Sequence, residues 1–394
     1  MTPKLRFPEF ENEEGWEKKP FEELLKIGNG RDYKHLEKGK IPVYGSGGYM
    51  LSVNDFLYDG ESACIGRKGT IDKPMFLSGK FWTVDTLFFT HSFRDCLPKY
   101  IYYVFQNIDW LKHNEAGGVP SLSKTNIYKI ENLVPPPQEQ QKITSCLSSL
   151  DEMIIAHSEK LDLLKDHKKG LMQNLFPQEG EKVPKYRFKE FEKDEEWVEK
   201  KLDNHIDLFS GIALKSEEIS DDESGMPILR GINITEGYIR HTKDIDKFFL
   251  GEIENFNRYF VKENDIVIGM DGSKVGKNVA LIGKEDENSI LIQRVARIRT
   301  KENADIHFVY QYFISDKFRG YVDKVNTSSG IPHISSQQIK DFKVGLPPKF
   351  KEQQKIASCL SSLDALIIGE TEKLKQLQLH KKGLMQGLFP KVID

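Results

Sequence analysis

Large apolar residues recur at alternating spacings of four and three in two long segments, residues 139–177 and 352–390. This spacing is typical of the a and d positions of a coiled coil, so each segment is predicted to be one long helix with a single apolar seam. At 1.5 Å per residue, each helix should be about 57 Å long. The seam positions are Ile143, Leu147, Leu150, Ile154, Leu161, Leu164, Leu171 and Leu175 in the first segment, and Ile356, Leu360, Leu363, Ile367, Leu374, Leu377, Leu384 and Leu388 in the second.

Polar residues interrupt both seams at matching places. They are His157 and Lys168 in the first helix, and Glu370 and Lys381 in the second. Polar seam residues often fix the register of two helices. We expect the helices to pair in antiparallel fashion, which would bring His157 or Lys168 near acidic partners. In the alternative, each helix packs only on its own domain as an ordinary amphipathic helix.

The two segments also repeat each other in sequence. They align without a gap at an offset of 213, with 28 identities in 39 positions. A weaker repeat precedes each half, where residues 3–16 match residues 184–197 at an offset of 181. One copy of this entry segment begins the chain, and the other follows the first long helix. The order is that of a closed ring cut at one point, so we expect neighbouring termini and a pseudo-two-fold axis.

The inserts between the repeats share little sequence. Each carries short apolar runs separated by glycine turns, and then a helical stretch, expected from Lys99 to about Lys112 in the first insert and near Ile306–Phe318 in the second. We interpret each insert as one α/β domain. The apolar runs are residues 41–44, 62–65 and 83–89 in the first insert, and 226–229, 265–268, 290–292 and 295–298 in the second.

The predicted fold class is therefore α+β, with two α/β domains joined by two long helices that form an antiparallel coiled coil with pseudo-two-fold symmetry. The expected division is residues 1–138 for the first domain, 139–177 for the first long helix, 178–184 for a linker, 185–349 for the second domain, and 350–394 for the second long helix and the end of the chain.

Composition narrows the class of protein. Charged residues make up 30% of the 394 residues and hydrophobic residues 38%, a soluble globular profile. With 57 Lys and Arg against 60 Asp and Glu, the net charge of −3 excludes binding to nucleic acid by bulk positive charge, but not through a local basic face. No apolar signal segment follows Met1, no run is long enough to span a bilayer, and the four cysteines form no CxxC pair. We expect a cytoplasmic protein without a membrane partner.

Two glycine-rich loops carry basic side chains at corresponding places, residues 65–70 and 268–278. Glycine lets a backbone approach a ligand closely, and Arg or Lys suits phosphates or the O6/N7 edge of guanine. Polar clusters at residues 121–126 and 333–338 carry the hydrogen-bonding groups that proteins use on bases and phosphates. The alternatives are a solvated hairpin for the loops and a helix N-cap for the polar clusters.

The chain shows no pattern of a catalytic site. Residues 271–278 resemble a P-loop, but Asp and Asn stand where GxxxxGK[ST] requires Gly and Ser or Thr. No GxSxG or HExxH motif occurs, and the cysteines and histidines lack the spacing of zinc ligands. We therefore expect a binding protein that is not an enzyme and that holds no cofactor or metal of its own.

The double arrangement resembles the specificity (S) subunits of type I restriction–modification systems. The resemblance rests on EQQKI at 139–143 and 352–356, and on HKKGLMQxLFP at 167–177 and 380–390. The PxxRFxxF entry segments at 3–10 and 184–191, each followed by a dissimilar insert, add to it. The resemblance covers essentially the whole chain.

Membership in that family implies a role for each part. Each insert would be a target recognition domain that reads one half of a bipartite, asymmetric sequence in double-stranded DNA. The helices would set the distance between the half-sites and dock two modification subunits, which bind S-adenosylmethionine and methylate adenine at N6. Methylation requires rotating the base out of the duplex, so the partner would supply that pocket. Restriction subunits that use ATP and Mg would complete the complex.

Local chemistry selects the candidate DNA contacts, because recognition domains vary too much for the resemblance to assign them. The candidates are Ser46, Arg67, Lys68, Ser121, Ser123 and Lys124 in the first domain, and Arg230, Ser273, Lys274, Lys277, Asn278, His333, Ser335 and Gln337 in the second.

Two other hypotheses remain open. One is a coiled-coil scaffold whose inserts bind proteins, which would show no sequence-dependent DNA binding with any methyltransferase partner. The other is the recognition portion of a single-chain restriction–methylation enzyme, detached from its catalytic parts. A neighbouring gene for a modification subunit would favour the multisubunit hypothesis over the latter.

Overall fold

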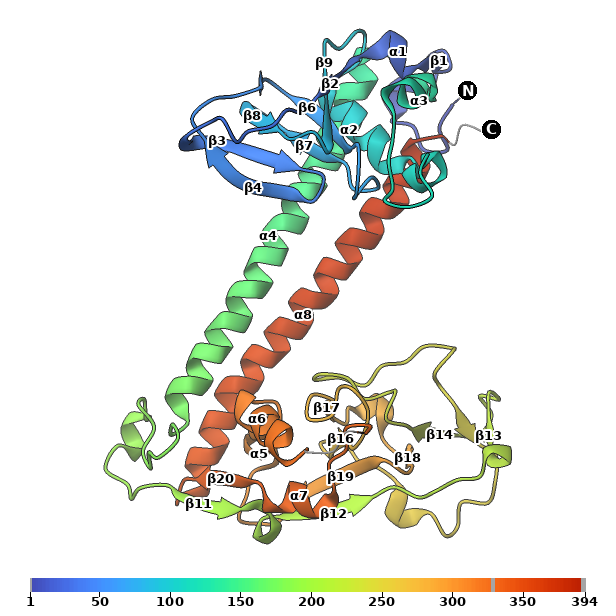
Figure 1. The fold of residues 1–394 in the computed structure, drawn as a ribbon. Helices are drawn as coiled ribbons and strands as arrows, with labels where there is room; N and C mark the ends of the chain where they lie inside the picture. The colour runs from blue at the N-terminus through green and yellow to red at the C-terminus, as the bar shows by residue number, and fades with distance from the viewer. Residues whose placement is uncertain (1, 327–329, 391–394) are drawn as a thin grey trace. The chain divides into compact units, whose positions relative to one another are not determined.

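The structure is a computed structural model that describes residues 2–326 and 330–390. Its contacts divide the chain into two compact units. The first unit contains the residues up to Lys160 together with those from Glu370 onward, and the second contains Leu161–Gly369. Both units combine helices with small sheets, so the chain has the predicted α+β fold (Figure 1).

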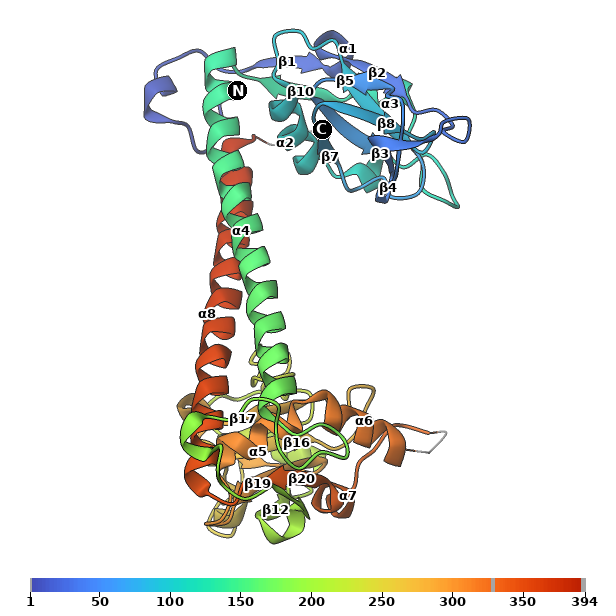
Figure 2. The same ribbon diagram turned by 90° about the vertical axis from the view of Figure 1, so that its left-hand side faces the viewer.

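Two 39-residue helices, α4 (Pro137–Leu175) and α8 (Phe350–Leu388), correspond to the predicted long helices. A proline occupies the first position of α4, where its missing N–H costs no hydrogen bond. The first unit contains the beginning of α4 and the end of α8, and the second unit contains the remaining parts. Within each unit the two helices lie side by side (Figures 1 and 2).

Ion pairs between α4 and α8 give the direction of this pairing. In the first unit, Asp151 lies 2.6 Å from Lys381, and His157, further along α4, forms a hydrogen bond with Glu370 on an earlier turn of α8. The helices therefore run antiparallel. In the second unit, Lys168 lies 2.5 Å from Asp364. The sequence left open whether His157 or Lys168 would find an acidic partner, and both do.

The entry segments lie against the ends of these helices. In the first unit, the backbone nitrogen of Leu5 donates to the carbonyl oxygen of Gly387 at 2.9 Å. In the second, the nitrogen of Tyr186 donates to the carbonyl oxygen of Asn174 at 2.8 Å, which is the same contact at the repeat offsets. The beginning of the chain thus lies beside the end of α8, as the ring-like order predicts. The pseudo-two-fold axis itself stays a prediction.

The first unit carries three small sheets with the strand orders β1-β10, β2-β9-β6-β7 and β4-β3-β8-β5. β3 and β8 pair in parallel, whereas the other pairs are antiparallel. The elements are β1 (Glu17–Pro20), α1 (Phe21–Leu24), β2 (Lys26–Asn29), β3 (Lys38–Gly45), β4 (Gly48–Val53), β5 (Tyr58–Asp59), β6 (Ser62–Gly66), β7 (Met75–Leu77), β8 (Lys80–Thr83), β9 (Leu87–His91), α2 (Pro98–Asn107), α3 (Lys124–Lys129) and β10 (Glu131–Val134).

The second unit has the strand orders β11-β20, β12-β19-β16-β17 and β13-β15-β14-β18. The first two sheets repeat those of the first unit, whereas in the third the strand β13 pairs with β15, at the edge opposite to that occupied by β5 in the first unit. Here β14 and β18 form the parallel pair. The elements are β11 (Val198–Lys201), β12 (Ile206–Ser210), β13 (Ile219–Ser220), β14 (Met226–Leu229), β15 (Phe248–Phe249), β16 (Ile266–Gly269), β17 (Val279–Leu281), β18 (Ile290–Leu291), β19 (Val295–Thr300), α5 (Ile306–Phe313), α6 (Asp316–Val325), α7 (Ser336–Asp341) and β20 (Lys343–Leu346).

The end of one long helix completes the core of each unit. Phe389, just after α8, stacks on Tyr100 of α2 with ring centroids 5.7 Å apart. Phe176, just after α4, stacks on Phe308 of α5 at 5.3 Å. Since all four side chains are at least 90% buried, the repeated Phe residues at the ends of the helices belong to the cores of the two units.

One apolar run of the sequence does not form a single strand. Residues 83–89 contain a turn at Asp85 and Thr86 between β8 and β9. The backbone nitrogen of Leu87 closes this turn on the carbonyl oxygen of Val84 at 2.9 Å. The break occurs because β8 pairs with β3 in one sheet, whereas β9 pairs with β2 and β6 in another.

Two predicted helices are also interrupted. α2 ends at Asn107, before the expected Lys112, because Ile108 is extended and the buried Trp110 donates its indole N–H to the Phe105 carbonyl. The stretch expected at 306–318 is two helices, α5 and α6. Ser315 separates them, since its extended backbone ends α5 and its side chain caps α6 by accepting from the nitrogen of Phe318.

Candidate nucleic-acid interface

In the first unit, the structure joins the glycine-rich loop to the polar cluster that closes the insert. The backbone nitrogen of Gly69 donates to the carbonyl oxygen of Pro120 at 2.9 Å, and that of Leu122 to the carbonyl oxygen of Arg67 at 2.9 Å. Between these bonds, Lys68 and Ser121 form an antiparallel bridge. Two segments about 50 residues apart in the sequence therefore form one surface.

The second unit makes the same loop pair. The nitrogen of Gly272 donates to the carbonyl oxygen of Pro332 at 3.0 Å, and that of Ile334 to the carbonyl oxygen of Met270 at 2.8 Å. Asp271 and His333 form the antiparallel bridge. The backbone framework is thus shared by both units, whereas the side chains differ: Arg67, Lys68 and Ser121 in one correspond to Met270, Asp271 and His333 in the other.

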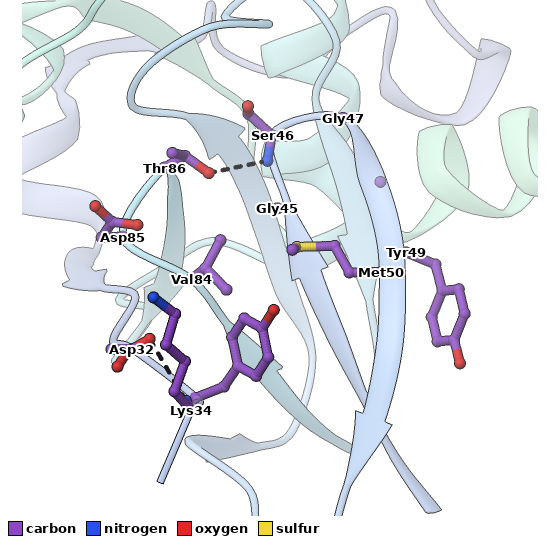
Figure 3. Close-up of a pocket in the computed structure, with 12 residues that line it drawn as sticks. Asp32, Lys34, Gly45, Ser46, Gly47, Tyr49, Met50, Val84, Asp85 and Thr86 are labelled. Atoms are coloured by element: carbon purple, nitrogen blue, oxygen red, sulfur yellow. Dashed lines mark hydrogen bonds between the residues drawn. The ribbon is translucent and has the colours of Figure 1, made fainter. Parts of the chain in front are cut away.

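The β8–β9 turn packs against the first loop pair. The carbonyl oxygen of Thr86 accepts from the nitrogens of Arg67 at 2.8 Å and Lys68 at 3.3 Å. Its hydroxyl accepts from the nitrogen of Ser46, at the tip of the β3–β4 hairpin, at 3.4 Å. Figure 3 shows Ser46 facing Thr86, with Asp85 on the same turn. Three of the candidate residues therefore surround one turn.

Two open hollows meet at this turn and share Asp85 and Thr86. One has a volume of about 570 Å³ and is lined by Lys34, Ser46 and Tyr49 among others (Figure 3). The other, of about 370 Å³, is lined by the loop pair. The residues that the second hollow adds are Arg67, Lys68, Glu115, Ser121, Leu122 and Ser123.

The exposed side chains around the hollows suit a nucleic acid. Arg67 and Lys68 are exposed, and within the described chain neither forms an ion pair. Tyr49, 62% exposed at the hairpin, offers a ring on which a base or sugar can pack. Cations for phosphates and polar groups for bases therefore lie together on one face of the first domain.

Some candidates are occupied by contacts within their own unit. Ser123 caps α3 by accepting from the nitrogen of Asn126, and Ser335 caps α7 in the same way, so the N-cap interpretation holds for both. The Lys124 ammonium donates to the carbonyl oxygen of Ile27 at 2.6 Å. Burial, followed by the nearby charge of Arg67, lowers the pKa of Lys124.

Arg230 is also engaged. Its guanidinium donates to the carbonyl oxygen of Ile245, and its backbone nitrogen to the Asn233 side chain at 3.1 Å. Neither contact reaches the 270–278 loop. The Arg230 side chain therefore organises its own loop, 230–246.

The remaining candidates of the second domain lie on the loop pair and its flanks. Lys274 and Lys277 are exposed, and the carbonyl oxygen of Lys274 accepts from the nitrogens of Lys277 and Asn278 at 3.0 and 3.1 Å, which makes the 270–278 loop a compact turn. Ser273, His333 and Gln337 are exposed. Asp271 pairs with Arg294 at 3.0 Å, so its negative charge is balanced within the unit.

A family model described as the type I restriction modification DNA specificity domain matches residues 13–166 and 194–379. The chain belongs to this family. The MjaVIII specificity subunit of Methanocaldococcus jannaschii is 27% identical over 353 residues, which are 86% of this chain and 79% of that protein. The EcoAI specificity subunit of Escherichia coli is 29% identical over 290 residues, 70% of this chain and 45% of that protein.

A solved structure has the same fold. The crystal structure of a type-I restriction-modification system S subunit from M. genitalium matches with a TM-score of 0.75, covering 100% of both chains at 16% identity. Each of the two specificity-domain matches in this chain contains one complete loop pair, 67–122 in the first and 270–334 in the second. Each specificity domain therefore carries its own candidate interface.

Sequence reasoning missed four residues at these interfaces. They are Asp85 and Thr86 on the β8–β9 turn and the corresponding Gln293 and Arg294 between β18 and β19. A signal was present in each case, because a polar pair stands between two apolar runs. The first pair was counted within the apolar run 83–89, and this concealed the turn.

The described residues, 2–326 and 330–390, contain no group of three or more His, Cys, Asp or Glu side chains that could hold a metal ion. None of the helices in these ranges combines the length and the hydropathy that a membrane span requires.

Proposed function

We propose that this chain is the DNA specificity subunit of a type I restriction–modification complex and that each domain reads one half of a bipartite, asymmetric target. The observation that carries this proposal is the pair of identical backbone frameworks with unlike side chains. Bridged loops hold Lys68 and Ser121 in one domain and Asp271 and His333 in the other. Two copies of one framework present different groups to DNA, so the half-sites differ.

The long helices provide the partner surface in this proposal. Their seam residues pack inward, but two positions that are apolar in both repeats remain exposed: Met153 and Ile155 on α4, and Leu366 and Ile368 on α8. They are 45%, 57%, 57% and 59% exposed, and they correspond at the offset of 213. Residues two apart on a helix point to different sides, so each repeat exposes one apolar side chain on either side of its seam. Equal exposed residues on two repeats fit two copies of one partner, here the modification subunit.

The chemistry then belongs to the partners. The modification subunits bind S-adenosylmethionine and methylate adenine at N6, and the restriction subunits use ATP and Mg. This chain contributes sequence recognition and, through α4 and α8, the distance between the half-sites. Its net charge of −3 fits such a division, because the partners share the neutralisation of DNA phosphates.

The test is to express this chain with its modification subunit in a host free of DNA methylation and to map N6-methyladenine by single-molecule sequencing. A bipartite, asymmetric methylated motif should appear. A culture that expresses the modification subunit alone is the control and should show no such motif. If both proteins are soluble and associated but no motif appears, the protein-binding scaffold becomes the better explanation.

A further inference from the structure

The turn between β8 and β9 has a structural counterpart in the second domain. Gly66 of β6 pairs with Leu87, and Gly269 of β16 pairs with Val295. Counting back from these pairs, Asp85 and Thr86 correspond to Gln293 and Arg294. The hydrogen bonds agree, since the carbonyl oxygen of Thr86 accepts from the nitrogen of Arg67 at 2.8 Å, and that of Arg294 from the nitrogen of Met270 at 2.9 Å.

The same backbone contacts support both turns. The nitrogen of Val84 donates to the Tyr44 carbonyl at 2.9 Å, and the nitrogen of Ile292 to the Leu229 carbonyl at 3.3 Å. A glycine passes beneath each turn: a Cβ on Gly30 would lie 1.9 Å from the oxygen of Val84, and one on Gly211 would lie 2.1 Å from the oxygen of Ile292. The side chains at the tip can therefore vary without changing the turn.

The second residue of each tip is tied to its own domain. The Thr86 hydroxyl accepts from the nitrogen of Ser46 at 3.4 Å. The Arg294 guanidinium pairs with Asp271 at 3.0 Å. These contacts hold the tip in place and leave the first residue, Asp85 or Gln293, to face outward.

Asp85 and Gln293 are exposed, and within residues 2–326 and 330–390 neither side chain has a hydrogen-bond or ion-pair partner. An unpaired carboxylate beside Arg67 and Lys68 repels the phosphates that these cations would attract. The Asp85 carboxylate is nevertheless compatible with a DNA interface if it accepts a hydrogen bond from the exocyclic amine of a base, which compensates for the repulsion of the phosphates. The amide of Gln293 has the donor and acceptor that match adenine N6 and N7.

We propose that these two turns are base-reading elements, in which Asp85 accepts a hydrogen bond from cytosine N4 or adenine N6 in one half-site and Gln293 pairs with adenine in the other. This inference rests on the proposed function. Asp85 and Gln293 are then the side chains through which one shared backbone framework recognises two unlike half-sites. Each lies on a turn beside the glycine-rich loop of its own domain.

The test uses full-length Asp85→Asn and Gln293→Glu variants, each expressed with the modification subunit, and compares their methylated motifs with that of the wild type. Asp85→Asn should reduce methylation of the wild-type motif about 10-fold and relax or change one base pair of one half-site. Gln293→Glu should do the same at one A·T pair of the other half-site. The wild-type pair affected by Asp85→Asn is G·C if the amine is cytosine N4 and A·T if it is adenine N6.

Asp59→Asn is the matched control, because Asp59 is exposed on β5, opposite Lys80 at the other end of β8. It should leave the motif unchanged. Asp85→Ala, which removes the acceptor without adding a donor, should relax the same base pair, and this second variant keeps the test valid if Asp85→Asn does not fold.

Three results would overturn the inference. They are an unchanged motif and rate in the Asp85 and Gln293 variants, an effect of either variant on both half-sites, and a Gln293 effect at a G·C pair. If the wild-type complex itself produces no motif, the proposed function fails as well, and this outcome is distinct because it precedes any comparison of variants.

Discussion

The ammonium group of Lys381 on α8 lies 2.6 Å from the carboxylate of Asp151 on α4. The other carboxylate oxygen of Asp151 accepts a hydrogen bond from the Tyr103 hydroxyl of α2 at 2.8 Å. The Asp151 side chain of α4 therefore contacts both the other long helix, α8, and the helix α2 of the first domain. The contact of Asp151 with Lys381 fixes the register of the two helices, and its contact with Tyr103 fixes the position of α2 on α4.

The second unit contains the same arrangement. Lys168 lies 2.5 Å from one oxygen of Asp364, and the Gln311 amide of α5 donates to the other at 3.1 Å. The lysines and the aspartates correspond at the repeat offset of 213. The domain partner differs, Tyr103 in one unit and Gln311 in the other, which shows that the repeat conserves the site but not every group in it.

Replacement of Asp151 by Ala should lower the free energy of unfolding of the first unit by about 1–3 kcal/mol. It removes the charged acceptor of partly buried donors on Lys381 and Tyr103, which then keep only Gln106 and Ser148 as partners. Urea unfolding of the full chain measures the change. Asp162→Ala is the control, since Asp162 is exposed on the same helix and has no partner within the described residues, and it should change stability by less than about 0.5 kcal/mol. Equal effects of both variants would contradict the role of Asp151.

Replacement of Arg6 by Ala should be more damaging. Arg6 donates two hydrogen bonds to Glu139, at 2.9 and 2.8 Å, and the two side chains are only 6% and 1% exposed. Removal of the cation leaves a buried carboxylate unpaired, at a cost of about 3–5 kcal/mol. Arg187, which holds Glu352 in the second unit at 2.8 Å, should show a similar loss.

The control for Arg6 is Lys142→Ala. Lys142 pairs with Glu9 at 2.8 Å, but these side chains are 50% and 45% exposed, so solvent screens the pair and the expected loss is below about 1 kcal/mol. Thermal unfolding of the three variants ranks the effects. A loss from Lys142→Ala as large as that from Arg6→Ala would refute the distinction between the buried and the exposed pair.

Acid should weaken the pairing of α4 and α8 in the first unit. The hydrogen bond from Lys160, and then that from His157, hold the pKa of Glu370 below its usual value of 4.5. A carboxylate whose pKa is lowered on folding contributes stability above its unfolded pKa and loses it as the pH falls through the folded value. Glu370→Gln should therefore lose less stability than the wild type as the pH falls below 4.5.

Urea midpoints of both proteins, measured from neutral pH into the acid range, provide the comparison for Glu370. Glu159→Gln, a change at an exposed carboxyl on α4, should follow the wild-type curve. Parallel curves for Glu370→Gln and the wild type would show that this carboxylate does not contribute to the acid sensitivity.

Lys68 and Lys124, both candidates from the sequence, should behave differently. Lys68 is exposed at the hollow. Lys68→Ala should therefore reduce the slope of log K for DNA binding against log salt concentration by about one, because one fewer counterion is released. Lys124 donates to the Ile27 carbonyl, so Lys124→Met should leave that slope unchanged and lower stability by about 1 kcal/mol. Binding of the assembled complex to its target at several salt concentrations separates the two roles.

The double variant Lys274→Ala with Lys277→Ala should weaken DNA binding and reduce the slope of log K against log salt concentration by about two. The reason is that both ammonium groups are exposed on one turn of the second loop pair. Lys200→Ala with Lys351→Ala is the matched control, since these lysines are exposed elsewhere in the same unit. An unchanged affinity and motif in the first double variant would exclude these two lysines from the interface.

The sequence by itself determined the helices and the repeat. Positions 143–175 and 356–388 carry a spacing that only a helix places on one side, and 28 identities in 39 positions made the two halves equivalent. These are properties of residues close together in the chain, or of one helix face, and a periodic pattern records them directly. The antiparallel pairing was an expectation from the polar residues in the two seams, and the contacts of Lys381 with Asp151 and of Lys168 with Asp364 supply its direction.

Only the tertiary structure decided which loops meet and where the chain turns. The polar pair Asp85–Thr86 is compatible with a turn and with a strand, and the break is decided by β8 and β9 pairing with strands of different sheets. The bridge between Lys68 and Ser121 likewise joins segments that no local pattern relates. Strand pairing is non-local, so the interface that it assembles is decided by backbone hydrogen bonds between distant residues, and the sequence shows only the side chains that such an interface then presents.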